Sequence, residues 1–269
     1  NQPAFWQALA YCKTTRTPLL VWIESTERDA RSDALPLELA KRALVRAAAG
    51  AFVPGRASAE YARSLGVPAE RVVEAPNAVD NAFFRAAPKH DGGTCRFLYV
   101  GRLDPEKGLD VLLDAFAGVP GELVLAGDGT EARALRARAP ERVRFLGPVS
   151  RDGLPELYAS ADVFVLPSLS EQWGMVLNEA ASAGLALVST NAAGAAYELV
   201  DEDLRVPAGD AVALAAALRR LADDPTLRRA AGERARTRVE ALTPEAWAEG
   251  VLELARRAAG RGPRSADPR

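Results

Sequence analysis

Residues 97–126 read FLYVGRLDPEKGLDVLLDAFAGVPGELVLA, and this segment carries the strand–helix–strand pattern that predicts the fold of the larger part of the chain. The apolar run at 97–100 predicts a buried strand, the helical spacing at 109–116 predicts a helix, and 123–126 predicts the next strand. The same alternation continues to residue 189, with strands at 143–146, 163–166 and 186–189 and helices at 131–138, 154–159 and 176–183. Strands that alternate with helices predict a doubly wound α/β domain with about five parallel strands or more.

The N-terminal part shows the same alternation with fewer strands. Apolar runs at 19–23, 51–53 and 71–74 predict strands, and helical patterns cover 5–13, 37–48 and 57–65. A complete Rossmann-type domain holds about six strands, so we expect an incomplete one here. Truncation of a longer chain is the favoured explanation, and a partner that completes the sheet is the alternative.

A polar stretch with proline and glycine at 88–93 has no periodicity and predicts the domain boundary. We therefore expect an N-terminal domain at 1–86 and a second domain at 87–242. Residues 243–269 should hold a helix that packs back towards the first domain and then a disordered tail from about residue 260.

Composition excludes several classes of partner. The 34 basic and 36 acidic residues give a net charge of −2, which favours no nucleic-acid partner. No apolar run is long enough for a membrane span, although peripheral membrane contact stays open. Cys12 and Cys95 lie in unrelated segments, so neither a disulfide framework nor a zinc site is indicated, and we expect a cytoplasmic protein.

The loop at 101–108 follows a predicted strand and offers two cations. Arg102 carries a planar guanidinium and Lys107 a compact ammonium, both suited to phosphate oxygens, and Gly101 permits close backbone approach. The alternative is a surface loop in which both cations pair with Asp104 and Glu106. The loop at 126–129, which contains Gly127, has only part of a dinucleotide-binding fingerprint and predicts a tight turn.

Residues 170–180 read SEQWGMVLNEA and carry two carboxylates at the start of a predicted helix. The first N–H groups of a helix lack partners within the helix and can bind an anion. Glu171 before the helix and Glu179 inside it could both reach one ligand and accept hydrogen bonds from sugar hydroxyls. The alternative is that Glu171 only favours the helix N-terminus electrostatically and Glu179 is a solvated helix residue. Two further loops, 191–194 and the acidic 201–203, are expected to be simple turns, the second of them solvated.

In this order, the segments 100–108, 126–129, 145–147, 158–167 and 171–180 resemble the family-4 retaining glycosyltransferases, the glycosyl transferases group 1. The spacing of Glu171 and Glu179 resembles the E-x7-E signature of that family. The resemblance covers about residues 76–242. It implies a GT-B fold of two Rossmann-like domains and an enzyme that transfers a sugar from a nucleotide-diphosphate donor, favoured to be a UDP-sugar, to a glycan or lipid acceptor.

The resemblance also implies roles for individual residues. Arg102 and Lys107 would hold the diphosphate, Glu171 would contact the sugar, and these three are the expected catalytic residues. Glu179 would bind the ribose hydroxyls. The other expected donor-binding residues are glycines at strand ends and the start of the helix: Gly101, Gly127, Gly147, Trp173, Gly174 and Met175. No metal and no cofactor is expected.

Three departures from the family pattern keep a second interpretation open. The first glycine-rich loop of the family has no counterpart, and Trp22 to Thr26 contains no histidine where the family commonly has one. The loop after Glu198 is also shorter. The alternative function is therefore a truncated nucleotide-sugar-binding module without catalysis.

Overall fold

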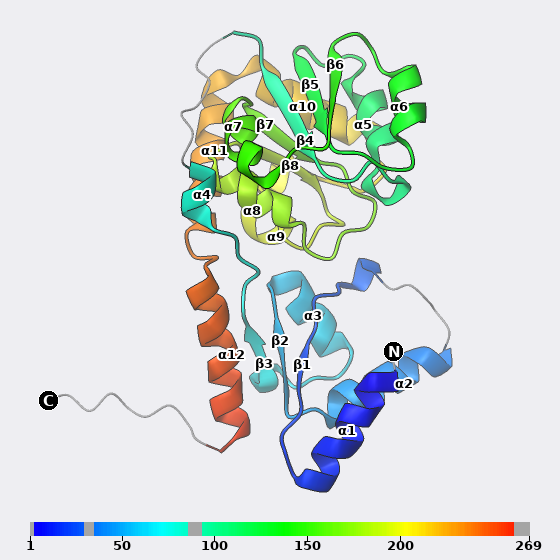
Figure 1. Ribbon diagram of the computed structural model, residues 1–269, viewed down its shortest axis with the longest axis vertical. Helices are drawn as coiled ribbons and strands as arrows, with labels where there is room; N and C mark the ends of the chain where they lie inside the picture. Colours follow the sequence, from blue (N-terminus) through cyan, green and yellow to red (C-terminus); the bar gives the residue numbers. More distant parts are fainter. Residues whose placement is uncertain (1–2, 30–34, 86–92, 261–269) are drawn as a thin grey trace, which may run out of the picture. The chain divides into compact units, whose positions relative to one another are not determined.

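The computed structural model describes residues 3–29, 35–85 and 93–260. The chain separates into two compact units (Figure 1). The first unit is built from residues 1–77 and 244–269, and the second from residues 78–243. The predicted tail from residue 260 lies almost entirely outside the described residues.

The second unit contains a six-stranded sheet in the order β6-β5-β4-β7-β8-β9, and all of its strand pairs are parallel. Its helices flank this sheet (Figure 1). The chain runs from β4 outwards to β5 and β6 and then continues with β7 on the other side of β4. The strand order therefore reverses between β4 and β7, which confirms the predicted doubly wound fold. In chain order the strands and α-helices are α4 (Asn81–Arg85), β4 (Arg96–Val100), α5 (Leu109–Phe116), β5 (Glu122–Ala126), α6 (Ala132–Arg138), β6 (Val143–Gly147), α7 (Leu154–Ala159), β7 (Val163–Leu166), α8 (Met175–Ser182), β8 (Ala186–Thr190), α9 (Ala196–Leu199), β9 (Arg205–Val206), α10 (Ala211–Asp223) and α11 (Pro225–Val239).

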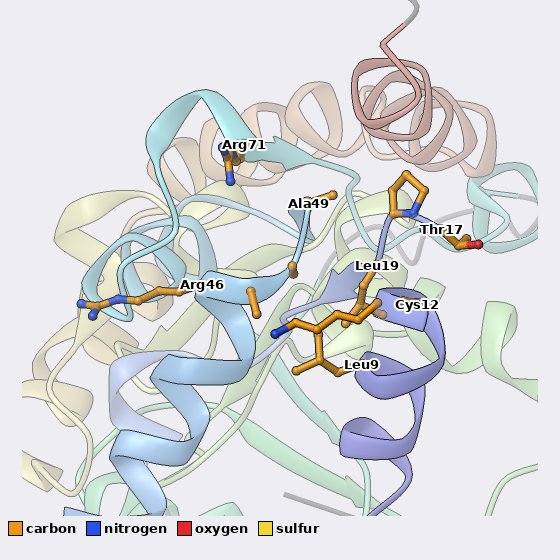
Figure 2. A pocket seen from close by; sticks show the side chains of 11 residues that line it. Leu9, Cys12, Thr17, Leu19, Arg46, Ala49 and Arg71 are labelled. Carbon is orange, nitrogen blue, oxygen red and sulfur yellow. The ribbon is translucent and has the colours of Figure 1, made fainter. Parts of the chain in front are cut away.

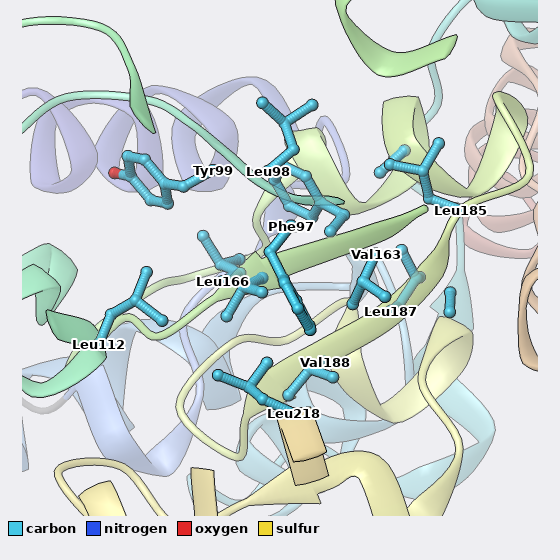
Figure 3. Close-up of a cluster of buried hydrophobic side chains, with 14 of the residues drawn as sticks. Phe97, Leu98, Tyr99, Leu112, Val163, Leu166, Leu185, Leu187, Val188 and Leu218 are labelled. Carbon is cyan, nitrogen blue, oxygen red and sulfur yellow. The ribbon is translucent and has the colours of Figure 1, made fainter. Parts of the chain in front are cut away.

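The central strands are apolar throughout because both faces of the sheet are covered. Every residue of β7 and β8 is buried, as expected for a parallel sheet between two helical layers. Phe97 of β4 pairs with Val163 of β7, which in turn pairs with Ala186 of β8. Figure 3 shows the side chains of these strands gathered into one core. This core fixes the strand ends from which the loops of the candidate site emerge.

The first unit contains a three-stranded parallel sheet in the order β1-β2-β3. Its buried core is smaller and includes Val21, Val45, Val53 and Leu65. The three predicted strands of this part of the chain are therefore confirmed. The elements before the second unit are α1 (Pro3–Thr15), β1 (Leu20–Trp22), α2 (Leu35–Ala47), β2 (Gly50–Val53), α3 (Arg56–Ser64) and β3 (Val72–Glu74).

The C-terminal helix α12 (Pro244–Ala258) belongs to the first unit, where it packs on β2 and β3. Leu254 is buried against this sheet, and a Cβ added to Gly250 would lie 2.3 Å from the backbone oxygen of Glu74. Only glycine lets the helix approach the strand this closely. The expectation that the C-terminal segment packs back on the first domain is confirmed.

The first compact unit ends earlier than the boundary expected at residue 86, because α4 belongs to the second unit. This helix packs on α7 and α8 and buries Phe84. Five residues are too few to show a helical period, so the docking of this segment could not be predicted from its pattern. The polar stretch that suggested the boundary lies mostly at 86–92, outside the described residues.

Candidate functional site

Four loops of the second unit emerge at the carboxyl ends of β4, β5, β7 and β8. Open α/β sheets bind their ligands at this edge, where the strand order reverses. The loops cover residues 101–108, 127–131, 167–174 and 191–195. Most of the predicted site residues lie on the first three, Gly147 ends β6, and Glu179 lies one helical turn inside α8.

Glycines let the loop after β4 and the loop after β5 lie in direct backbone contact. A Cβ added to Gly127 would lie 1.8 Å from the backbone oxygen of Gly101, and one added to Gly129 would lie 2.5 Å from the backbone of Leu103. Hydrogen bonds join the same loops, from Gly101 N–H to Ala126 O at 2.9 Å and from Leu103 N–H to Asp128 O at 2.9 Å. Gly127 is therefore required by loop packing.

The loop after β7 is joined to the loops on both sides of it. On the β4 side, Leu169 N–H donates to Glu106 O at 2.8 Å, and a Cβ on Gly108 would lie 2.4 Å from Pro167 O. On the β8 side, Ala195 N–H donates to Trp173 O at 2.9 Å. The four loops thus form one connected frame along the sheet edge, so side chains on different loops keep a fixed spacing.

Lys107 and Glu171 meet across the point where the strand order reverses. The Nζ of Lys107 lies 2.5 Å from Oε2 of Glu171, and their side chains are only 14% and 19% exposed. The sequence alternative, in which Lys107 pairs with the nearby acids of its own loop, is not what the structure has. The pair places one positive and one negative group side by side at the ligand edge.

Arg102 pairs with the acidic residues of its own loop, which is the alternative interpretation of this segment. Its guanidinium binds Asp104 Oδ2 at 2.5 Å and Glu106 Oε1 at 2.6 Å, and the side chain is 66% exposed. Solvent-exposed ion pairs contribute little stability, so the guanidinium can leave Glu106, whose side chain is 40% exposed, at low cost. The backbone of Arg102 is fixed, because the buried hydroxyl of Tyr99 donates to its carbonyl oxygen at 2.6 Å.

The start of α8 is shaped by Gly174, which has a φ of 93° and a ψ of 65°. Its N–H and that of Met175 have no acceptor among the described residues, as expected at a helix N-terminus. Trp173 is buried, and its indole N–H donates to Asn178 Oδ1 at 2.9 Å. The indole therefore anchors the loop to the helix, and Met175 remains 37% exposed at the first position of α8.

Glu179 is half-buried, so the alternative of a solvated helix residue is wrong. The Tyr158 hydroxyl donates to its Oε2 at 2.6 Å. Burial raises the pKa of Glu179, whereas the Tyr158 hydroxyl and the Arg151 guanidinium lower it, and the net pKa lies above the usual value. Sequence reasoning assigned no role to Tyr158, although a tyrosine on a buried helix face needs a partner for its hydroxyl.

Two positions singled out in the sequence remain: Gly147 and the acidic turn at 201–203. Gly147 ends β6 with a φ of 75° and no heavy atom within 4 Å of an added Cβ, so it faces open space. The acidic turn at 201–203 was expected to be solvated, but it is partly buried. Asp201 is only 12% exposed and binds Arg234 and Arg238, while Asp203 binds Arg220. These pairs give the turn a structural role.

A cavity of about 240 Å³ lies in the first unit (Figure 2). It is lined by α1, by the end of α2 and by residues that precede the strands, including Leu19, Ala49 and Arg71. These residues lie at the amino ends of β1, β2 and β3, and ligands of open α/β sheets bind at the carboxyl ends. Figure 2 shows the Arg46 guanidinium directed away from Leu9 and Cys12. We therefore place the candidate site on the second unit.

The fold and the site together define a domain that can bind an anionic ligand at the reversal point of a parallel sheet. Residues 80–238 match the family described as Glycosyl transferases group 1, and the chain belongs to that family. This confirms the resemblance drawn from the sequence motifs.

Curated relatives are glycosyltransferases by name. Glycogen synthase of Mycobacterium tuberculosis (strain ATCC 25618 / H37Rv) is 35% identical over 212 residues, which are 72% of this chain and 50% of that protein. D-inositol 3-phosphate glycosyltransferase of Kineococcus radiotolerans is 32% identical over 244 residues, 76% of this chain and 56% of that protein. The chain spans about half the length of these relatives.

Solved structures confirm the GT-B type of fold. Sucrose-phosphate synthase from Thermosynechococcus elongatus has a TM-score of 0.79 and 25% identity, with 95% of this chain and 71% of that chain covered. Anabaena Alr3699/HepE in complex with UDP has a TM-score of 0.76 and 22% identity, with 97% and 76% covered. Among the helices of the described ranges, none has the length and apolarity needed to cross a bilayer.

Proposed function

We propose that the chain carries the donor-binding part of a retaining glycosyltransferase that takes a sugar from a nucleoside-diphosphate sugar, favoured to be a UDP-sugar. The observation that carries this proposal is the Lys107–Glu171 pair, held at 2.5 Å between the loops after β4 and β7. An ammonium matches a diphosphate, and a carboxylate matches sugar hydroxyls. Related folds support the choice of donor, since HepE is described in complex with UDP and with UDP-glucose.

Arg102 and Lys107 would hold the diphosphate and stabilise the charge that grows on it as the sugar leaves. Arg102 could turn towards a ligand because its side chain is 66% exposed and its partner Glu106 is 40% exposed, although its other partner, Asp104, is 14% exposed. The N–H groups of Gly174 and Met175 would add two neutral donors. A single preorganised donor of this kind typically contributes about 3 kcal/mol to transition-state stabilisation.

Glu171 would accept a hydrogen bond from a sugar hydroxyl while it stays paired with Lys107. We assign it as a stabiliser of the positive charge on the sugar and not as a nucleophile. In the transfer step the bond from the anomeric carbon to the diphosphate oxygen breaks, and the bond to the acceptor oxygen forms on the same face. The acceptor proton passes to the leaving diphosphate oxygen. Because the new bond forms on the face that the diphosphate leaves, the anomeric configuration is retained. The two cations supply the positive charge, so we propose that no metal is needed.

The acceptor and the cellular location follow from the relatives and from the cysteines. We propose a glycan or lipid precursor as acceptor, and the name of the glycogen synthase relative supports the glycan. A cytoplasmic location fits the two cysteines, Cys12 and Cys95, which are both free.

The second candidate function is a donor-binding module without catalysis. In the first unit, Glu24 accepts a hydrogen bond from Asn77 at 2.6 Å, in the segment where the family pattern leads us to expect a histidine. Donor binding depends on the second unit and would survive this difference. Nucleoside diphosphate release in the presence of donor and acceptor separates the two candidates, because the module would bind the donor and release nothing.

Thermal unfolding with UDP, GDP and ADP tests donor binding. A nucleotide at one hundred times its Kd stabilises the folded state by about 2.7 kcal/mol, which raises the midpoint measurably. The double variant Arg102→Ala, Lys107→Ala should lose this shift, and Lys13→Ala, an exposed lysine of α1, should keep it. If the double variant is stabilised as strongly as the parent chain, the site lies elsewhere.

A further inference from the structure

The carboxylate of Glu179 is held from one side only. Its Oε2 accepts a hydrogen bond from the Tyr158 hydroxyl at 2.6 Å, and no hydrogen bond to Oε1 is found among the described residues. An ionised carboxylate is an acceptor at both oxygens, so the Tyr158 hydroxyl must be the donor. The arrangement leaves Oε1 as the acceptor for a ligand and fixes the side chain through Oε2.

Tyr158 itself is locked by rings from two other elements. It is fully buried, and its ring meets Phe84 of α4 edge-on at 5.7 Å and an angle of 81°. The Phe164 ring of β7 packs against it at 5.8 Å. Because aromatic pairs of this geometry are directional, the hydroxyl has one position from which to reach Glu179.

The helix α4 that carries Phe84 is tied to the helix that carries Glu179. Asn81 Oδ1 accepts from the Ser182 hydroxyl of α8 at 2.7 Å, and Asn81 Nδ2 donates to Val239 O at the end of α11 at 3.1 Å. Arg85 also binds Glu240. The segment that enters the second unit and the segment that leaves it are thus joined to each other and to α8.

We propose that Tyr158, braced by Phe84, is a positioning residue that orients the Glu179 carboxylate for the ribose hydroxyls of a nucleoside diphosphate. This inference rests on the proposed function, in which Glu179 contacts the ribose. Tyr158 touches no ligand and acts through Glu179 alone. Its effect should therefore vanish when the carboxylate is removed.

The charged groups around Glu179 allow a second, independent readout. Tyr158 and Arg151 are the titratable groups that act on its carboxylate, and both lower its pKa against the effect of burial. The arginines of the other packed helices have partners, Glu240 for Arg85 of α4 and Asp201 for Arg238 of α11. Removing the Tyr158 hydroxyl should raise the pKa of Glu179 further. As the pH is lowered, the carboxylate should then become protonated, and nucleotide affinity should fall, at a higher pH than in the parent chain.

A double-mutant cycle tests the proposal, with calorimetric Kd values for the nucleotide among UDP, GDP and ADP that stabilises the parent chain. Tyr158→Phe should weaken binding by about five- to tenfold, about 1 to 1.4 kcal/mol. Glu179→Gln should weaken it at least as much, and the double variant should match Glu179→Gln alone. Tyr61→Phe is the matched control, because it removes a buried tyrosine hydroxyl in the first unit, and it should leave Kd unchanged.

The outcomes separate the inference from the proposed function. If Glu179→Gln leaves Kd unchanged, the proposed ribose contact is wrong. If Glu179→Gln weakens binding but Tyr158→Phe does not, or if the two effects add, the positioning role is wrong. Should Tyr158→Phe fail to unfold cooperatively, Phe84→Leu keeps the hydroxyl and loosens only the ring. It should weaken binding by a few-fold in the parent chain and not at all in the Glu179→Gln background; an equal loss in both would contradict the proposal.

Discussion

Replacing Gly127 with alanine should force apart the loops after β4 and β5. The added Cβ would lie 1.8 Å from Gly101 O, whereas real Cβ contacts stay beyond 3.0 Å, so the backbones must separate by at least 1.2 Å. This movement would break the hydrogen bond from Gly101 N–H to Ala126 O, now 2.9 Å, and strain that from Gly127 N–H to Gly147 O, now 2.8 Å.

The cost of this substitution follows from its parts. Two loop hydrogen bonds contribute about 1 kcal/mol each, and overpacking typically costs about 1–3 kcal/mol, so the loss of unfolding free energy should be roughly 3–5 kcal/mol. The left-handed φ of Gly127, 134°, adds strain. Gly93→Ala is the matched control, because Gly93 has a φ of 94° and no atom within 4 Å of an added Cβ. It should lose only about 1 kcal/mol.

Urea unfolding of the three proteins measures this difference, with the transition of the second unit identified as the one that nucleotide raises. Gly127→Ala should also lose nucleotide stabilisation, because the backbone of Arg102 lies on the displaced loop. If Gly127→Ala costs no more than Gly93→Ala, the two loops can separate freely, and the connected frame inferred for the site is wrong.

Three other predictions concern the Asp201 ion pairs, the Tyr99 hydroxyl and the metal independence of nucleotide binding. Burial raises the pKa of Asp201, but the hydrogen bonds from Arg234 and Arg238 outweigh it and hold the pKa below the usual value. A lowered carboxyl pKa adds stability above the unfolded-state pKa of about 3.9 and loses it as the pH falls. Asp201→Asn should therefore remove part of the acid limb of a stability–pH curve, and an unchanged limb would rule out this pair as its source. Tyr99→Phe should cost about 1 kcal/mol in urea unfolding, because the carbonyl of Arg102 loses its buried donor; an unchanged midpoint would show that the hydroxyl does not hold the loop. Treatment with EDTA should leave nucleotide affinity unchanged, because the proposed site binds the diphosphate through Arg102 and Lys107, and a loss restored by Mg²⁺ would contradict this.

The doubly wound sheet could be predicted because each of its central strands is a separate apolar run in the sequence. The residues of β7 and β8 are all buried, so each run stands out without needing alternation. The edge strand β9 could not be predicted in this way. The two residues of β9, Arg205 and Val206, form too short a run to be recognised.

The partners of the site residues could not be predicted, because they depend on which strands become neighbours. Lys107 has Asp104 and Glu106 close by in sequence, yet it binds Glu171, which is 64 residues away. Only the placement of β7 beside β4 brings these two loops together. Tyr158 and Glu179 are likewise 21 residues apart and meet through the packing of their helices.

The groups that lie against the site glycines could not be predicted from the sequence either. The sequence placed Gly101 and Gly127 at strand ends, and it suggested close approach of a ligand to the backbone at Gly101 and a tight turn at Gly127. In the structure Gly127 makes room for the neighbouring loop, and a side chain at Gly101 would meet the Tyr99 hydroxyl at 2.8 Å. Glycine signals a close approach, but the approaching group is fixed by the tertiary fold.

Comparing a nucleoside diphosphate with its unphosphorylated nucleoside tests the claim that Lys107 holds the diphosphate of the donor. Calorimetry would give Kd for both ligands with the parent chain, with Lys107→Ala and with the control Lys13→Ala. Loss of one charged hydrogen bond should weaken diphosphate binding by about 10- to 100-fold while nucleoside binding stays the same. Equal diphosphate affinity in the parent chain and Lys107→Ala would contradict the claim.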